Sequence, residues 1–140
     1  NQRDDQNSTA FATPFCRSRQ RMSTQSRATS LREAGNERFK KRDYDGAIDF
    51  YSQSLKVEET AAGTVHRIAF NPCSYSNRAL CYINLHRYSL GLKDADMSIS
   101  LDPLFVKSWL RRGICRMELK QPQLAYFDLM RVFHLLRAEL

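Results

Sequence analysis

The stretch NRALCYINL, residues Asn77–Leu85, has the outline of a buried helix, yet it begins with an amide. Thirty-four residues later the same pattern recurs as RRGICRMEL, residues Arg111–Leu119. A small residue, a cysteine and a leucine recur at matching places, whereas the leading residue changes from Asn77 to Arg111. The recurrence of one helical pattern along the chain indicates an internal repeat.

The small residue inside each copy sets a register for most of the chain. Gly35, Ala79 and Gly113 are separated by steps of 44 and 34 residues. The same two steps connect Leu31, Tyr75 and Trp109; Tyr44, Tyr88 and Pro122; Ala47, Gly91 and Ala125; and Tyr51, Ala95 and Leu129. Five such sets of residues, which we call columns, share the same two steps, and this agreement is too regular to arise by chance. The unit is therefore 34 residues long, and ten extra residues, within the stretch Glu59–Pro72, precede the second copy.

Each unit reads as two helices joined by a turn. Apolar residues recur three and four positions apart, with a break near the middle of the unit. In the first unit Asp43 can cap a helix that begins near Tyr44. In the third, Pro122 suits the first turn of a helix, where its missing N–H costs nothing. The small columns allow the two helices of a unit to approach closely.

Composition bounds the class of protein. The chain has 140 residues, a length that suits one domain. Its net charge is +7. It has no apolar run of membrane-spanning length. Four cysteines (Cys16, Cys73, Cys81, Cys115) and three histidines (His66, His86, His134) form no close ligand pair, so we expect neither a metal nor a cofactor. Cys81 and Cys115 recur in register, which indicates small buried packing residues in a reducing, cytoplasmic compartment.

Residues 1–29 differ in composition from the rest. They are rich in Ser, Thr, Gln and Arg and poor in apolar residues, which predicts a disordered basic tail. A mitochondrial presequence has a similar composition, but Asp4, Asp5 and the missing apolar stripe argue against one. Since the chain does not begin with methionine, we expect it to be a piece of a longer protein.

The columns resemble the tetratricopeptide repeat: a large apolar residue, a small one four positions later, then Tyr, Ala, an aromatic residue and a closing Pro. LREAGNERFKKRDYDGAIDFYSQSLKVE (31–58) and SYSNRALCYINLHRYSLGLKDADMSISLDP (74–103) follow this pattern closely. KSWLRRGICRMELKQPQLAYFDLMRVFHLL (107–136) departs from it at Pro122 and lacks the closing proline. The resemblance implies an all-α solenoid, a right-handed superhelix with a concave groove. We expect a three-repeat domain over 30–140, with repeats at about 30–58, 74–103 and 107–137 and an extra loop at 59–72.

In that fold the first helix of each repeat lines the groove, so polar residues on those helices face a bound ligand. Five of them resemble the dicarboxylate clamp of tetratricopeptide co-chaperones: Arg32, Asn36, Asn77, Lys107 and Arg111. Four match the clamp pattern, and Arg32 stands where lysine is usual. In the family, such clamps hold the terminal carboxylate and an aspartate of the acidic C-terminal tail of 70- and 90-kDa heat-shock chaperones.

The resemblance therefore implies a co-chaperone or adaptor that binds such a peptide. Phe39, Ile83 and Met117 are candidates for an apolar floor, and Glu118 would repel an acidic peptide if it pointed inward. We expect Lys107 and Arg111 to be exposed in the empty groove.

Some features of the sequence fit other functions. The first is an architectural scaffold, because LMRVFHLLRAEL, residues 129–140, runs apolar to the chain's end. The second is nucleic-acid binding by the tail and Arg38–Arg42, which basic charge alone supports only weakly. No catalytic constellation stands out, so we predict a protein that is not an enzyme.

Overall fold

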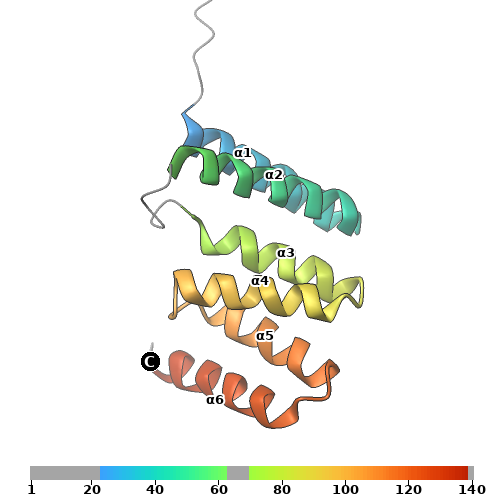
Figure 1. Ribbon diagram of the computed structural model, residues 1–140, viewed down its shortest axis with the longest axis vertical. Coiled ribbons are helices and arrows are strands. Elements are labelled where there is room, and N and C mark those ends of the chain that lie inside the picture. The colour runs from blue at the N-terminus through green and yellow to red at the C-terminus, as the bar shows by residue number, and fades with distance from the viewer. Residues whose placement is uncertain (1–22, 63–69, 139–140) are drawn as a thin grey trace, which may run out of the picture.

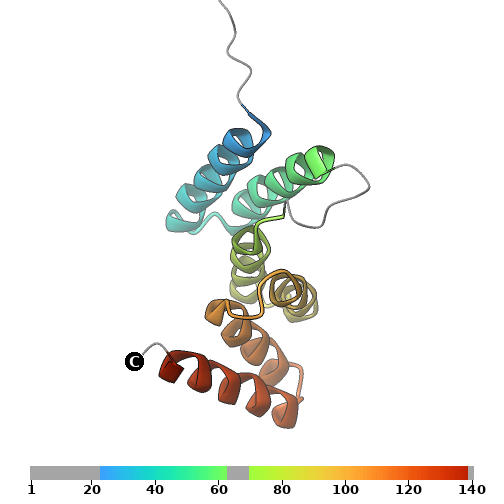
Figure 2. The ribbon, with the colours of Figure 1, turned by 90° about the vertical axis from the view of Figure 1, so that its left-hand side faces the viewer.

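The computed structural model describes residues 23–62 and 70–138, and within these ranges it contains helices and turns. The helices are α1 (Thr24–Lys40), α2 (Tyr44–Ala62), α3 (Pro72–Asn84), α4 (Tyr88–Leu101), α5 (Val106–Glu118) and α6 (Pro122–Ala138). They form three antiparallel pairs that follow one another along the long axis of the molecule (Figure 1). The helix directions change progressively from α1 to α6, which gives the stack its twist (Figure 2).

Local signals in the sequence set most of the helix boundaries. The backbone N–H of Gly46 donates to Asp43 Oδ1 at 3.0 Å, which confirms Asp43 as the cap of α2. α6 begins at Pro122, as predicted. α3 also begins at a proline, and the side chain of Asn71 caps it by accepting from Cys73 N at 2.8 Å.

The first helix begins earlier than the composition suggested. α1 starts at Thr24, capped by Ser23, and not near residue 30. Ala28 is fully buried, and its carbonyl accepts a hydrogen bond from Ser54 Oγ at 2.9 Å. Residues 24–29 therefore belong to the folded repeat and not to a disordered tail, and the rest of that predicted tail (1–22) lies outside the described residues.

The interior is built from small side chains, which lets the helix pairs approach closely. The fully buried positions include Ala47, Ala79 and Ala95 together with Cys81 and Cys115. The prediction that both cysteines serve as small packing residues is confirmed. Gly35 shows how tight the approach is, because a Cβ at that position would lie 2.7 Å from Cε1 of Tyr51.

Ion pairs tie the two helices of a repeat together. Arg78 on α3 forms a two-pronged pair with Asp94 on α4, with distances of 2.7 and 2.8 Å. Arg112 on α5 binds both carboxylate oxygens of Asp128 on α6 in the same way, at 3.1 and 2.7 Å. Each arginine and its aspartate are 16 residues apart, so this contact follows the repeat.

Within the described ranges, we find no helix with the length and apolar character that crossing a membrane requires.

Candidate functional site: a donor-lined pocket

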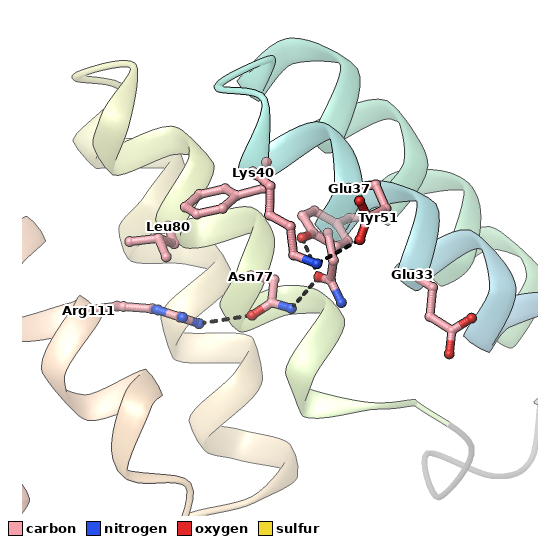
Figure 3. Close-up of a pocket in the computed structure, with 9 residues that line it drawn as sticks. Glu33, Glu37, Lys40, Tyr51, Asn77, Leu80 and Arg111 are labelled. Carbon is pink, nitrogen blue, oxygen red and sulfur yellow. Dashed lines mark hydrogen bonds and ion pairs between the residues drawn. The ribbon is translucent and has the colours of Figure 1, made fainter.

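A pocket of about 470 Å³ opens between the first helices of the repeats. Its lining comes mainly from α1, with two residues from α3 and one each from α2 and α5 (Figure 3). The lining residues are Glu33, Asn36, Glu37, Phe39, Lys40, Tyr51, Asn77, Leu80 and Arg111. Asn77 and Arg111 begin the two repeated stretches of the sequence and lie within α3 and α5, and their amide and guanidinium groups meet in this pocket.

A chain of hydrogen bonds runs across this pocket through all three repeats. Arg111 Nη1 donates to Asn77 Oδ1 at 3.4 Å, and Asn77 Nδ2 donates to Asn36 Oδ1 at 3.3 Å (Figure 3). The hydroxyl of Tyr51 also donates to Asn36 Oδ1, at 2.7 Å. Both amide oxygens are therefore engaged within the protein. The amide and guanidinium N–H groups left over are donors, and donors suit an anion.

Arg111 is the unusual member of the set, because it is a buried cation without a counter-ion. It is only 9% exposed, and no carboxylate among the described residues pairs with it. Burial lowers the pKa of its guanidinium. Burial also acts on Arg78 and Arg112, but their aspartates outweigh it and raise the pKa of both.

A series of buried, neutral hydroxyl groups is linked by hydrogen bonds to Arg111. Its Nη1 donates to Ser76 Oγ, which lies 3.2 Å from Ser108 Oγ. Ser108 Oγ in turn lies 2.6 Å from Ser98 Oγ, and all three serines are fully buried. Hydroxyls satisfy the hydrogen-bonding capacity of the guanidinium without cancelling its charge, so the positive charge stays available to the pocket.

Comparison with known proteins gives the family. No family model matches the chain. The Hsp70-Hsp90 organizing protein 2 of Arabidopsis thaliana is 38% identical over 90 residues, which are 64% of this chain and 14% of that protein. The first TPR of Spaghetti (RPAP3), bound to the HSP90 peptide SRMEEVD, has a TM-score of 0.70 and 30% identity, over 78% of this chain and 79% of that one.

The chain belongs to the tetratricopeptide repeat family. A second solved member, the second TPR domain of human RPAP3 in complex with the HSP70 peptide SGPTIEEVD, has a TM-score of 0.70 and 28% identity. That match covers 80% of this chain and 85% of that domain. By contrast, the chain spans about a seventh of the length of its Arabidopsis relative.

The tetratricopeptide groove gathers some of the predicted clamp residues and leaves others aside. Asn36, Asn77 and Arg111 line the pocket. Arg32 does not, and its Nη1 lies 4.0 Å from Oε1 of the buried Glu58. Lys107 is exposed on α5, outside the lining. Arg111 itself is buried, which corrects the expectation that it would be exposed in the empty groove.

The predicted apolar floor is also only partly assembled. Phe39 lines the pocket, whereas Ile83 is half-buried and Met117 is 50% exposed, both outside the lining. Glu118 is exposed and does not line the pocket either.

Sequence reasoning missed several lining residues. Leu80 follows Asn77 by three positions and Lys40 follows Asn36 by four, so helical spacing alone could have found both. Tyr51 is different, because it lies on the second helix of its repeat and reaches the pocket past the small Gly35. Only the close approach of the two helices brings it there.

Two glutamates, Glu33 and Glu37, complete the lining on α1. Glu37 Oε1 accepts a hydrogen bond from Lys40 Nζ at 2.7 Å, and this bond lowers the pKa of the exposed carboxyl. The pocket therefore has the cation Arg111 on α5 and both acidic and basic side chains on α1.

The described residues contain no cluster of three or more His, Cys, Asp or Glu side chains that could hold a metal ion. The chemistry that this pocket offers is recognition of an anion by N–H donors.

Proposed function

We propose that this tetratricopeptide domain is a co-chaperone or adaptor module that binds the acidic C-terminal peptide of 70- or 90-kDa heat-shock chaperones. Asn36, Asn77 and Arg111 form the centre of the clamp, and Phe39 and Leu80 provide apolar contact for a ligand side chain. The proposed activity is binding without catalysis, in the cytoplasm. The free thiols of Cys73, Cys81 and Cys115 support a reducing compartment.

The observation that carries this proposal is the buried, uncompensated charge of Arg111. A buried cation without a carboxylate partner is costly, and an anionic ligand would relieve that cost. The Arg111 guanidinium and two neighbouring amides, those of Asn36 and Asn77, direct N–H donors to one place. A terminal carboxylate, with two oxygens and several lone pairs, is the matching acceptor.

The relatives support the same ligand class. The peptides in the two RPAP3 structures, SRMEEVD and SGPTIEEVD, share the ending EEVD. Such an ending carries acidic side chains and an α-carboxylate close together. The Arabidopsis relative is named as an Hsp70-Hsp90 organizing protein.

Two further cations complete the proposed clamp once a ligand is present. Lys107 is exposed on α5, four residues before Arg111, so its flexible stem can turn toward a peptide in the groove. Arg32 has weaker ties than the paired arginines, a 4.0 Å approach to Glu58 and a 3.5 Å hydrogen bond to Thr29 Oγ1. Release from these contacts would let its guanidinium reach the peptide. Ile83 and Met117 remain candidates for contacts farther along the groove.

A calorimetric titration with free-acid SRMEEVD tests the proposal. We expect a dissociation constant near micromolar, about −8 kcal/mol. Amidation of the peptide's C-terminus should weaken binding sharply, because the donors would then face a neutral group. Arg111→Ala should cost about 1.5–3 kcal/mol of binding free energy, the worth of a charge-assisted hydrogen bond. The matched control is Lys93→Ala, which removes an exposed cation from α4 and should leave binding unchanged.

Equal affinity for the acid and the amide would contradict the clamp and favour the alternative function, an architectural scaffold. One observation favours that alternative: α6 exposes several large apolar side chains, among them Tyr126, Phe127 and Phe133, at 57–66%. A scaffold contact through α6 would be independent of the peptide's terminus and insensitive to Arg111→Ala.

A further inference from the structure

Tyr51 contributes to the lining of the pocket, yet its side chain is almost fully buried. Tyr51 is on α2, its side chain is 1% exposed, and its hydroxyl donates to Asn36 Oδ1 at 2.7 Å. We propose that Tyr51 is a positioning residue that fixes the Asn36 amide with its NH₂ group toward the bound carboxylate, an inference that rests on the proposed function of this pocket.

Packing holds the tyrosine ring in place. The ring belongs to the core cluster with Ala47 and Cys81, and Phe39 packs against that cluster. The ring also lies directly against Gly35, so close that a Cβ there would lie 2.7 Å from Cε1 and 2.9 Å from Cδ1 of the ring. A ring confined in this way places its hydroxyl at one point, and a fixed hydroxyl can orient a neighbouring group.

The hydrogen-bonding capacity of Asn36 decides which way its amide points. The amide oxygen has two lone pairs, and Tyr51 Oη and Asn77 Nδ2 donate to both. No described residue accepts a hydrogen bond from Asn36 Nδ2, so both of its hydrogens stay free for a ligand in the pocket. The single proton of Tyr51 is spent on Asn36, so the tyrosine acts through the amide and not on the ligand itself.

Loss of the hydroxyl would weaken this preference for one amide orientation. Asn36 Oδ1 would keep only the longer bond from Asn77, at 3.3 Å. The amide could then turn by half a rotation and present its oxygen to the pocket. An oxygen in that position repels a carboxylate, so some of the free protein would become unable to bind, and the apparent affinity would fall with the population of the competent orientation.

Tyr51→Phe tests the inference in two ways. In calorimetry, the variant should bind free-acid SRMEEVD about five- to tenfold more weakly than the unmodified chain, the range expected for one net hydrogen bond. Tyr44→Phe is the matched control, because Tyr44 packs against the same core cluster and does not line the pocket. It should leave the affinity unchanged.

A double-mutant cycle separates positioning from a general structural effect. If Tyr51 acts only through Asn36, then in an Asn36→Ala background Tyr51→Phe should change the dissociation constant by less than about twofold. Equal losses in both backgrounds would assign the effect to packing and overturn the proposal, as would unchanged binding by the single variant.

A ligand-free measurement distinguishes failure of this inference from failure of the proposed function. In the free protein, the side-chain NH₂ resonances of Asn36 should shift and broaden in Tyr51→Phe, because the amide would then sample two orientations. They should remain sharp in Tyr44→Phe. Unchanged Asn36 resonances in Tyr51→Phe would overturn the positioning role whether or not the peptide binds. Absence of peptide binding by the unmodified chain, with the resonance change present, would overturn the proposed function alone.

Discussion

At the scale of single residues, the pocket depends on one side chain that the fold tolerates at a cost. Arg111 is desolvated, and its hydrogen-bond partners, Ser76 and Asn77, are neutral. We therefore expect Arg111 to contribute to ligand binding and not to stability, because desolvation of its charge is not offset by a counter-ion. Arg78 is also largely buried, but Asp94 compensates its charge.

This contrast predicts opposite stability effects for two similar substitutions. Arg111→Met should leave the free energy of unfolding unchanged or raise it by about 1 kcal/mol, because it removes a desolvated charge and keeps the apolar stem. The same variant should lose peptide binding. Arg78→Met should lower the free energy of unfolding by about 3 kcal/mol, since Asp94 would stay buried without its partner. Chemical denaturation of both variants measures the difference, and comparable losses would show that Arg111 has a structural role after all.

At the scale of elements, the three turns within the repeats share one backbone conformation. Arg42, His86 and Lys120 have φ angles of 61°, 56° and 61°, and they are spaced by the same 44 and 34 residues as the repeat columns. In the first turn Arg42 N bonds to Phe39 O at 2.9 Å, and Asp43 N bonds to Arg38 O at 3.0 Å. The other two turns have equivalent pairs of bonds. Each first helix therefore ends in a Schellman motif whose left-handed residue is not glycine.

A glycine at such a position should stabilise the domain. Lys120→Gly removes the steric cost of a side chain at positive φ and should raise the free energy of unfolding by about 0.5–1 kcal/mol. Lys93→Gly, within α4, is the matched control and should lower it by about 1 kcal/mol, the helix-interior cost of glycine. A thermal melt of the two variants suffices. A lower melting temperature for Lys120→Gly would mean that the lysine side chain makes a contact worth more than its strain.

These turns also show where sequence reasoning reached its limit. The break near the middle of the first repeat was predicted, but the conformation of Arg42 was not, because the usual signal for a left-handed residue is glycine. Similarly, Ser, Thr, Gln and Arg in residues 24–29 read as disorder, although tertiary contacts bury Ala28 within α1. Local composition does not report contacts that another helix supplies.

At the scale of the whole molecule, the periodic columns were sufficient to predict three helix pairs and their register, because each column marks a recurring helix contact. The columns, together with the resemblance to the tetratricopeptide clamp, placed Asn36, Asn77 and Arg111 on one surface. They did not predict that Arg111 would be buried against Ser76, which lies 35 residues earlier, or that Arg32 would lie near Glu58. Helical spacing gives the face that a side chain shares, whereas its final partner depends on how helices far apart in the sequence pack.

The small-residue interior has a consequence for the pH dependence of stability. Burial raises the pKa of the Cys81 thiol from 9.0 to about 12 and that of Cys115 from 9.0 to about 11. In the unfolded chain both thiols ionise near pH 9, but in the folded chain they stay protonated to higher pH. Between these values the folded state holds more protons than the unfolded state, so stability is full below pH 9 and is lost as pH rises toward the folded pKa values.

Each thiol should therefore contribute a slope that approaches about 1.4 kcal/mol of unfolding free energy per pH unit in this window. Denaturant unfolding under reducing conditions at about pH 8 and about pH 10.5 measures the total slope, to which lysines and tyrosines also contribute. Cys81→Ala removes one thiol from a site that is fully buried, so the variant should start from a lower stability and yet lose less of it between the two pH values. The other titrating groups are common to both proteins, so the difference in slope isolates Cys81. Equal slopes for the variant and the unmodified chain would mean that the Cys81 thiol ionises in the folded protein as readily as in the unfolded one, and that the interior between the repeats admits water.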